Sequence, residues 1–231
     1  MHKRAVRWWY LPKGLRQMKT KNCNVCILGD SYSTFRGYLP EGQAVYYPNP
    51  EKVKDVTTVE HTWWQPLFAR RNMHLLINDS YSGSTVCKDT RPGQGPESAF
   101  VYRMHNTLSS RGIGGEKPDV IFLFGTTNDA WLDRKVGENM YENRTEEDLF
   151  CVLPAACEMI EFVTKENPQA LVCVMINCGI KDEIRMGLKA AAEHYGAAAV
   201  VLHDIDKENG HPTKLGMAQI SAQAEEVLDK A

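Results

Sequence analysis

The chain has 231 residues and a formal net charge of -2 at pH 7, and 43% of its residues are hydrophobic while 24% are charged. A chain of this length and composition can bury one sizeable α/β core, and so small a net charge creates no field that would attract a polyanion. These features argue against a nucleic-acid partner, and no apolar stretch is long enough to predict a membrane span.

The first 21 residues form a basic segment. They contain seven lysines and arginines, no acidic residue, and the aromatic run Trp8, Trp9 and Tyr10. Such a short arm is more typical of a solvated leader than of a binding element, and it lacks the uninterrupted apolar core of a signal peptide. We therefore predict a basic extension over residues 1–21, one domain over 22–231, and a cytoplasmic location, with export left open.

Short apolar runs alternate with longer amphipathic segments after this extension. The apolar runs predict strands over residues 24–28, 74–77, 120–124, 171–176 and 198–202. The amphipathic segments predict helices over residues 62–71, 97–110, 146–166, 180–195 and 214–229. Long loops are predicted over residues 36–49, 90–96 and 132–144. This order is typical of the α/β class, with five parallel strands and helices on both faces of the sheet.

Residues suited to catalysis follow the first three predicted strands. Because the carboxyl ends of parallel strands share one edge of a sheet, these residues should gather there. Ser31, in Gly-Asp-Ser, presents a hydroxyl at a strand-to-helix turn. Gly83 lets a backbone N–H approach a substrate oxygen, and Asn128, in Gly-Thr-Thr-Asn-Asp, offers a neutral amide donor.

A histidine follows the fifth predicted strand. His211 lies just before the last predicted helix, and Pro212 biases it toward an extended backbone. His203, at the end of the strand, is a rival base, although a structural hydrogen bond is the more common role at that position. Asp30 and Asp129, beside Ser31 and Asn128, are expected to fix their loops through bonds from backbone N–H groups.

These four positions, in this order, resemble the motif blocks of the SGNH (GDSL-like) hydrolase family: a G-D-S serine, a glycine, an asparagine and a D-x-x-H histidine. The resemblance runs from about residue 24 to the end of the chain. It implies a three-layer α/β/α sandwich that is flavodoxin-like, and ester hydrolysis through an acyl-enzyme without metal or organic cofactor. Ser31 would attack, His211 would take its proton, and the Ser31 and Gly83 N–H groups with the Asn128 amide would form the oxyanion hole.

Two positions depart from the family pattern. The third block is one residue longer than the family's G-x-N-D, and Glu208 stands where the family has an aspartate three residues before the histidine. The residue that orients His211 is therefore open between Glu208, which we assign first, Asp206, and a Ser–His dyad steadied by a backbone carbonyl.

Aromatic residues are the candidates for substrate contact. Trp63 and Trp64 open the helix before the second strand, where one could stack on a sugar or acyl chain, although core packing is expected for at least one; Tyr32 adjoins Ser31. The predicted substrate is a small-acyl ester, such as an acetylated carbohydrate. An acyltransferase or thioesterase on the same site, and a non-catalytic flavodoxin-like binding module, are the alternatives. The sequence does not predict an oligomeric state.

Cysteine and histidine spacing predicts neither disulfides nor a metal site. The seven cysteines are odd in number and irregularly spaced, which favours reduced thiols. Cys23 and Cys26 form a C-x-x-C, but on a strand residues three apart face opposite sides.

Overall fold

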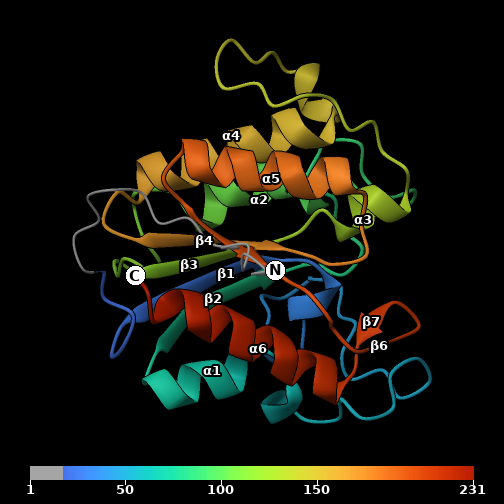
Figure 1. Ribbon diagram of the computed structural model, residues 1–231, viewed down its shortest axis with the longest axis vertical. Helices are drawn as coiled ribbons and strands as arrows, with labels where there is room; N and C mark the ends of the chain where they lie inside the picture. Colours follow the sequence, from blue (N-terminus) through green and yellow to red (C-terminus); the bar gives the residue numbers. More distant parts are fainter. Residues whose placement is uncertain (1–17) are drawn as a thin grey trace, which may run out of the picture.

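Five parallel strands form the central sheet of the structure, a computed structural model in which residues 18–231 are described (Figure 1). The strand order is β2-β1-β3-β4-β5. The strands are β1 (Asn24–Gly29), β2 (His74–Ser80), β3 (Val120–Phe124), β4 (Leu171–Ile176) and β5 (Ala198–Val201). This is the flavodoxin-like order, so the predicted α/β fold with five parallel strands is confirmed.

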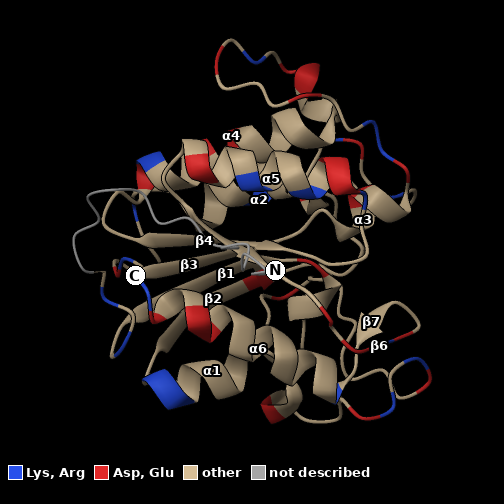
Figure 2. Cartoon of the chain, viewed as in Figure 1, with Lys and Arg blue, Asp and Glu red and all other residues tan. Residues whose placement is uncertain are grey.

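Helices cover both faces of the sheet. In Figure 1, α1 and α6 lie on one side of the sheet, and α2, α4 and α5 lie on the other. The helices are α1 (Trp64–Arg71), α2 (Phe100–Thr107), α3 (Thr127–Trp131), α4 (Val152–Glu166), α5 (Asp182–His194) and α6 (Lys214–Leu228). Within β3, Phe122 packs into the core under α1 and α6, whereas Ile121 packs into the core under α2, α4 and α5. Strands buried on both faces must be apolar throughout, which explains why β3 and β4 carry no charge (Figure 2).

Helices α2 and α4 begin furthest from their predicted starts, for one reason. Before α2, Pro96–Ser98 forms a 3-10 turn and Ala99 is extended; before α4, Asp148–Phe150 forms a 3-10 turn and Cys151 is extended. Side-chain hydrogen bonds, such as that from the Ser98 hydroxyl to the Gly95 carbonyl, stabilise these turns in place of a first helical turn.

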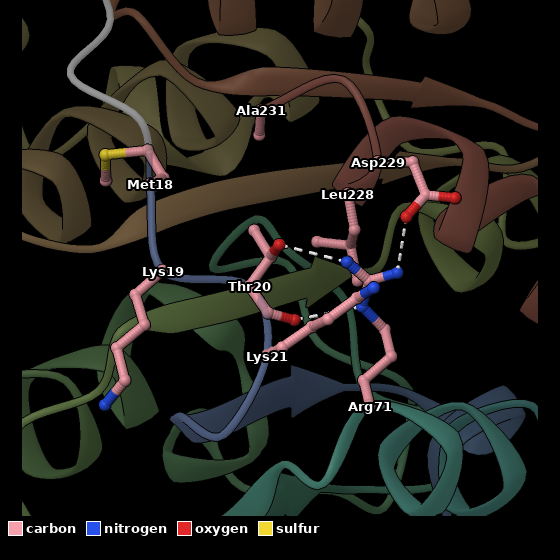
Figure 3. A pocket seen from close by; sticks show the side chains of 8 residues that line it. All are labelled: Met18, Lys19, Thr20, Lys21, Arg71, Leu228, Asp229 and Ala231. Carbon is pink, nitrogen blue, oxygen red and sulfur yellow. Dashed lines mark hydrogen bonds and ion pairs between the residues drawn. The ribbon is translucent and has the colours of Figure 1, made fainter.

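The first described residues lie beside the end of the chain. The Met18 N–H donates to the Ala231 carbonyl at 3.3 Å. Arg71, which is buried, donates to the Thr20 carbonyl at 2.9 Å and pairs with Asp229 at 2.7 Å (Figure 3). The start of the described chain is thus fixed to α1 and α6. Residues 1–17, most of the predicted basic extension, lie outside the described residues.

The seven cysteines all lie within residues 18–231, and each is free; five are buried. In the same part of the chain, no helix combines the length and apolar character needed to cross a membrane.

Candidate active site

Ser31 lies at the carboxyl end of β1, in a tightly packed turn. A Cβ on Gly29 would come within 2.4 Å of the Ser80 hydroxyl and 2.8 Å of the Ser33 Cβ, so a glycine is required there. Asp30 accepts a hydrogen bond from the Tyr32 N–H at 3.0 Å and thereby caps the 3-10 turn Ser31–Ser33, as predicted. Burial raises the pKa of the Asp30 carboxyl to about 7, whereas the bond from the Tyr32 N–H lowers it.

A short β-hairpin positions His211. Strands β6 (Lys207–Glu208) and β7 (His211–Pro212) pair antiparallel, and Asn209 and Gly210 between them have φ angles of 49° and 78°. Two positive φ angles define a type I′ turn, for which Asn-Gly is a strong sequence signal. The predicted strands did not include this hairpin, although Asn209-Gly210 is a sequence signal for it.

Two tyrosines fix this hairpin to the rest of the site. The Tyr32 hydroxyl donates to the Gly210 carbonyl at 2.5 Å, and the Tyr47 hydroxyl donates to the Pro212 carbonyl at 2.8 Å. Both tyrosines are fully buried. The carbonyl groups on either side of His211 are therefore held by rigid side chains.

Ser31 and His211 are in hydrogen-bond contact. The Ser31 Oγ lies 3.0 Å from the His211 Nε2, and the two residues are 2% and 8% exposed. The pKa of His211 is lowered to about 4, chiefly because burial disfavours the charged imidazolium; the hydrogen bond with the Asn209 carbonyl opposes this shift, and the Lys207 ammonium adds to it. A neutral imidazole at this distance can accept the proton of an attacking hydroxyl.

The other imidazole nitrogen faces a backbone carbonyl. His211 Nδ1 lies 3.3 Å from the Asn209 oxygen. The Glu208 carboxylate instead accepts from the Lys54 N–H at 3.4 Å, and Asp206 accepts from the Thr213 hydroxyl. The assignment of Glu208 as the orienting residue is therefore corrected. The type I′ turn places the Asn209 carbonyl beside His211 Nδ1. The Glu208 side chain, which is one methylene longer than an aspartate, points instead to the backbone of Lys54.

Three hydrogen-bond donors suited to an oxyanion hole follow β1, β2 and β3 at the carboxyl edge of the sheet. Among residues 18–231, the N–H groups of Ser31 and Gly83 have no hydrogen-bond acceptor. Gly83 has a φ of 87°, which favours glycine. The Asn128 amide donates to the Ser84 carbonyl at 3.0 Å and has a second hydrogen to offer.

Comparison with known proteins identifies the family of the chain. The sequence profile described as GDSL-like Lipase/Acylhydrolase matches residues 23–228. The chain belongs to this family. The resemblance to SGNH hydrolases is thus confirmed, and the protein is a serine hydrolase of ester substrates.

Solved structures share the fold of this GDSL-like hydrolase. A protein from Bacteroides ovatus described as a GDSL-like lipase is 36% identical over 90% of this chain and 99% of that chain, with a TM-score of 0.81. A second, from Bacteroides uniformis, is 36% identical over 90% and 96%, with a TM-score of 0.82. A member of the lipolytic G-D-S-L family from Veillonella parvula, 18% identical over 90% and 99%, has a TM-score of 0.55 and shows the fold alone. Among curated proteins, none matches the chain.

The extra residue in the third block forms a left-handed turn. Thr126 has a φ of 70° and a ψ of -8°, which is rare for a β-branched residue. Asn128 then lies in the first turn of α3, a helix too short for the sequence pattern to reveal. Asp129 accepts from the Val86 and Cys87 N–H groups, as expected of a residue that fixes its loop.

The predicted substrate-contacting aromatics are buried. Trp63 and Trp64 are fully buried, and their indole N–H groups donate to the Ser33 hydroxyl and carbonyl. Tyr32 is also fully buried, where it holds the hairpin. The assignment of these three residues to substrate contact is therefore corrected, because each packs in the core and donates a hydrogen bond inside the fold, whereas the core packing expected for at least one tryptophan is found for both.

Other aromatic residues surround His211 instead. The Tyr46 ring stacks on the imidazole, with 3.6 Å between centroids and 6° between planes. Trp131, 45% exposed, meets the imidazole edge-on at 5.4 Å. Neither residue was among the predicted substrate contacts. Trp131 could have been found from its position three residues after Asn128, which places both residues on the same side of the short helix that follows β3.

Proposed function

We propose that the protein hydrolyses carboxylic esters through an acyl-enzyme on Ser31, with His211 as the general base. The observation that supports this most is the 3.0 Å contact between the Ser31 hydroxyl and a buried imidazole that is neutral at pH 7. As the Ser31 oxygen bonds to the ester carbon, its proton passes to His211 Nε2. The tetrahedral intermediate then expels the alcohol, which takes that proton. His211 next takes a proton from a water molecule as that water attacks the acyl carbon. The second tetrahedral intermediate then breaks its bond to the Ser31 oxygen, which takes the proton back from His211 as the carboxylic acid leaves.

The oxyanion of each tetrahedral intermediate would be bound by the Ser31 and Gly83 N–H groups and the Asn128 amide. Donors held in place before the reaction stabilise charge that develops only in the transition state. One such donor typically contributes about 3 kcal/mol to lowering the barrier.

The base is a dyad without a carboxylate. The Asn209 carbonyl contact supports one orientation and one tautomer of the imidazole. The stacked Tyr46 ring offers its π face to the imidazolium that forms during turnover. These contacts take over part of what an aspartate does in a triad.

The alcohol half of the substrate is proposed to be a carbohydrate, and the acyl half a small group such as acetyl. His211 protonates the leaving alcohol, so the alcohol lies on the histidine side, where Trp131 exposes part of its indole. An exposed indole is a good surface for stacking a sugar ring.

Hydrolysis assays with matched variants test this proposal. The wild type should release acetate from p-nitrophenyl acetate and from acetylated methyl glycosides, and Ser31→Ala should lose at least about 10³-fold in kcat. Ser109→Ala, which changes a serine outside the site, should retain wild-type rates. Undiminished turnover by Ser31→Ala would contradict the proposal, and the absence of any turnover by the wild type would favour a non-catalytic binding module.

Variants of Trp131 test separately whether the alcohol half of the substrate is a carbohydrate. Trp131→Ala should lower kcat/KM for acetylated glycosides about 10-fold and leave methyl acetate, which has no ring, within about 2-fold. Trp131→Phe should retain most of the glycoside activity. Equal losses on both substrates would contradict a sugar-stacking role while leaving the Ser31 chemistry intact.

A further inference from the structure

Arg91 lies beside both residues that complete the proposed oxyanion hole. Its Nη2 donates to the Asn128 Oδ1 at 3.0 Å, and its Nε donates to the Gly83 carbonyl at 3.5 Å. Arg91 belongs to the predicted loop 90–96, in which the Gln94 N–H donates back to the Arg91 carbonyl and closes a tight turn. One turn therefore reaches the Gly83 loop and the start of α3 together.

No acidic partner neutralises this guanidinium within residues 18–231. Arg134, by contrast, pairs with Asp89 at 3.1 Å. The charge of Arg91, which is half-buried, is directed instead at two uncharged carbonyl oxygens. Charge-assisted hydrogen bonds of this kind are stronger than bonds between neutral groups, so they can hold both carbonyl groups in place.

The same turn holds the peptide that carries the Gly83 N–H. The Gln94 side-chain amide donates to the Ser82 carbonyl at 2.9 Å. In a trans peptide the carbonyl and the next N–H point in opposite directions, so holding the Ser82 oxygen fixes the direction of the Gly83 N–H. Gln94 thus acts on one oxyanion donor, and Arg91 acts on the other.

Arg91 also distinguishes the two ends of the Asn128 amide. A side-chain amide can rotate by 180° and exchange its oxygen and nitrogen. A cation at Oδ1 and a carbonyl at Nδ2 permit only one orientation, in which the second N–H of Nδ2 remains available. The cation also polarises the amide and strengthens that donor.

From this geometry we infer that Arg91 and Gln94 are positioning residues that orient the Asn128 and Gly83 donors of the oxyanion hole, an inference that rests on the proposed function. Neither residue needs to touch the substrate. Because the oxyanion exists only in the transition state, the effect belongs to kcat rather than to KM.

Kinetics of single variants provide the test. Arg91→Ala and Gln94→Ala should each lower kcat on p-nitrophenyl acetate by about 10- to 100-fold and change KM by less than about 3-fold. Arg91→Lys should recover part of the loss, since an ammonium can reach one carbonyl but not both. Arg111→Ala, an exposed arginine in the loop that precedes β3 and hence at the opposite edge of the sheet, is the matched control and should behave as wild type.

Inhibitor affinity separates this role from a purely structural one. The affinity for a boronic acid, which forms a tetrahedral anionic adduct with the serine, should fall in Arg91→Ala by the same factor as kcat/KM, at an unchanged melting temperature. Unchanged kcat in both variants, or a loss that follows a lowered melting temperature, would overturn the inference.

Two further outcomes identify which claim has failed. A rise in KM confined to negatively charged esters would make Arg91 a substrate-binding residue and overturn the positioning role. Undiminished turnover by Ser31→Ala would instead refute the proposed function itself, whatever the Arg91 and Gln94 variants do.

Discussion

His211 combines a buried position with an uncharged state. Its imidazole stacks on Tyr46, meets Trp131 edge-on, and lies near the ammonium of Lys207. Removing a histidine from water disfavours its charged form, and a nearby cation does the same. The residue is therefore suited to accept a proton over a wider range of pH than an exposed histidine.

The uncharged state of His211 predicts at which pH activity falls on the acid side of the pH–rate profile. Burial lowers the pKa of His211 to about 4 from its usual 6.5, and only the neutral form can act as a base. The value of kcat/KM should stay level from pH 7 to about pH 5 and reach half its maximum near pH 4. Lys207→Met removes the repulsion and should move the limb to higher pH. A wild-type limb near pH 6.5 would contradict the burial argument.

The variant Glu208→Gln tests the corrected assignment. Because Nδ1 faces the Asn209 carbonyl, loss of the carboxylate should change kcat by less than about 3-fold. Steady-state kinetics on p-nitrophenyl acetate give the answer, with Asp206→Asn measured beside it. A drop of about 10³-fold or more would instead assign Glu208 the part that an aspartate has in a triad.

Single residues were predictable where a motif fixes them. The order of Ser31, Gly83, Asn128 and His211 along the chain predicts that Ser31 and His211 lie together, and the two are in hydrogen-bond contact. For Trp63 and Trp64, core packing was expected of at least one, but the sequence does not show which indole points into the core and which toward solvent; both are buried.

At the scale of elements, the β6–β7 hairpin decides where His211 lies. Its Asn209-Gly210 turn reverses the chain in two residues, and Trp131 packs closely over it. A strained or wider turn would displace the imidazole from Ser31. The hairpin has only four paired residues, but it sets the distance between the Ser31 hydroxyl and the His211 imidazole.

Substituting the turn glycine tests that dependence. Gly210→Ala places a Cβ at a φ of 78° and 3.1 Å from the Trp131 ring, so kcat should fall about 10-fold and stability by about 1 kcal/mol. Gly115→Ala has a similar φ of 87° but no atom within 4 Å of the added Cβ. The Gly115→Ala variant should therefore lose stability but keep the wild-type kcat. Equal kcat losses in both variants would contradict a specific role for the hairpin.

The strands were predicted better than the elements that carry the site. β3 and β4 match the predicted ranges, since doubly buried strands are short and uniformly apolar. The hairpin and α3 have too few residues to show a period, so they depend on turn chemistry that the periodicity does not report.

At the scale of the whole molecule, one buried arginine connects the segments that form the site. Arg103 donates to the Gly29 carbonyl at 3.0 Å, to the Ser84 hydroxyl at 3.2 Å and to the Asp79 carboxylate at 3.0 Å. It lies on α2 and is 5% exposed. The ends of β1 and β2 and the loop after β2 are thus held by one guanidinium.

Removing the Arg103 guanidinium should lower the stability of the fold. Arg103→Met leaves Asp79 buried without its partner, and we expect the free energy of unfolding to fall by about 3–5 kcal/mol. Chemical denaturation measures it, with Arg111→Met as the exposed control. A loss below about 1 kcal/mol would show that the remaining contacts of Asp79, with Gln43 and Thr107, suffice.

The overall architecture followed from the alternation of apolar and amphipathic segments, whereas the buried charges did not. Arg103 lies in a segment whose period predicts a helix, but its partner Asp79 lies 24 positions earlier in the chain. Pairings over such distances depend on the folded chain. A single sequence does not contain them in any local pattern.

Covalent labelling of the folded protein tests the central claim most directly. A fluorophosphonate should add once, on the peptide that contains Ser31, with the rate reduced by at least about 10³-fold in His211→Ala and no adduct in Ser31→Ala. An adduct on a different residue, or labelling of Ser31 that is equally fast without the imidazole of His211, would contradict the account.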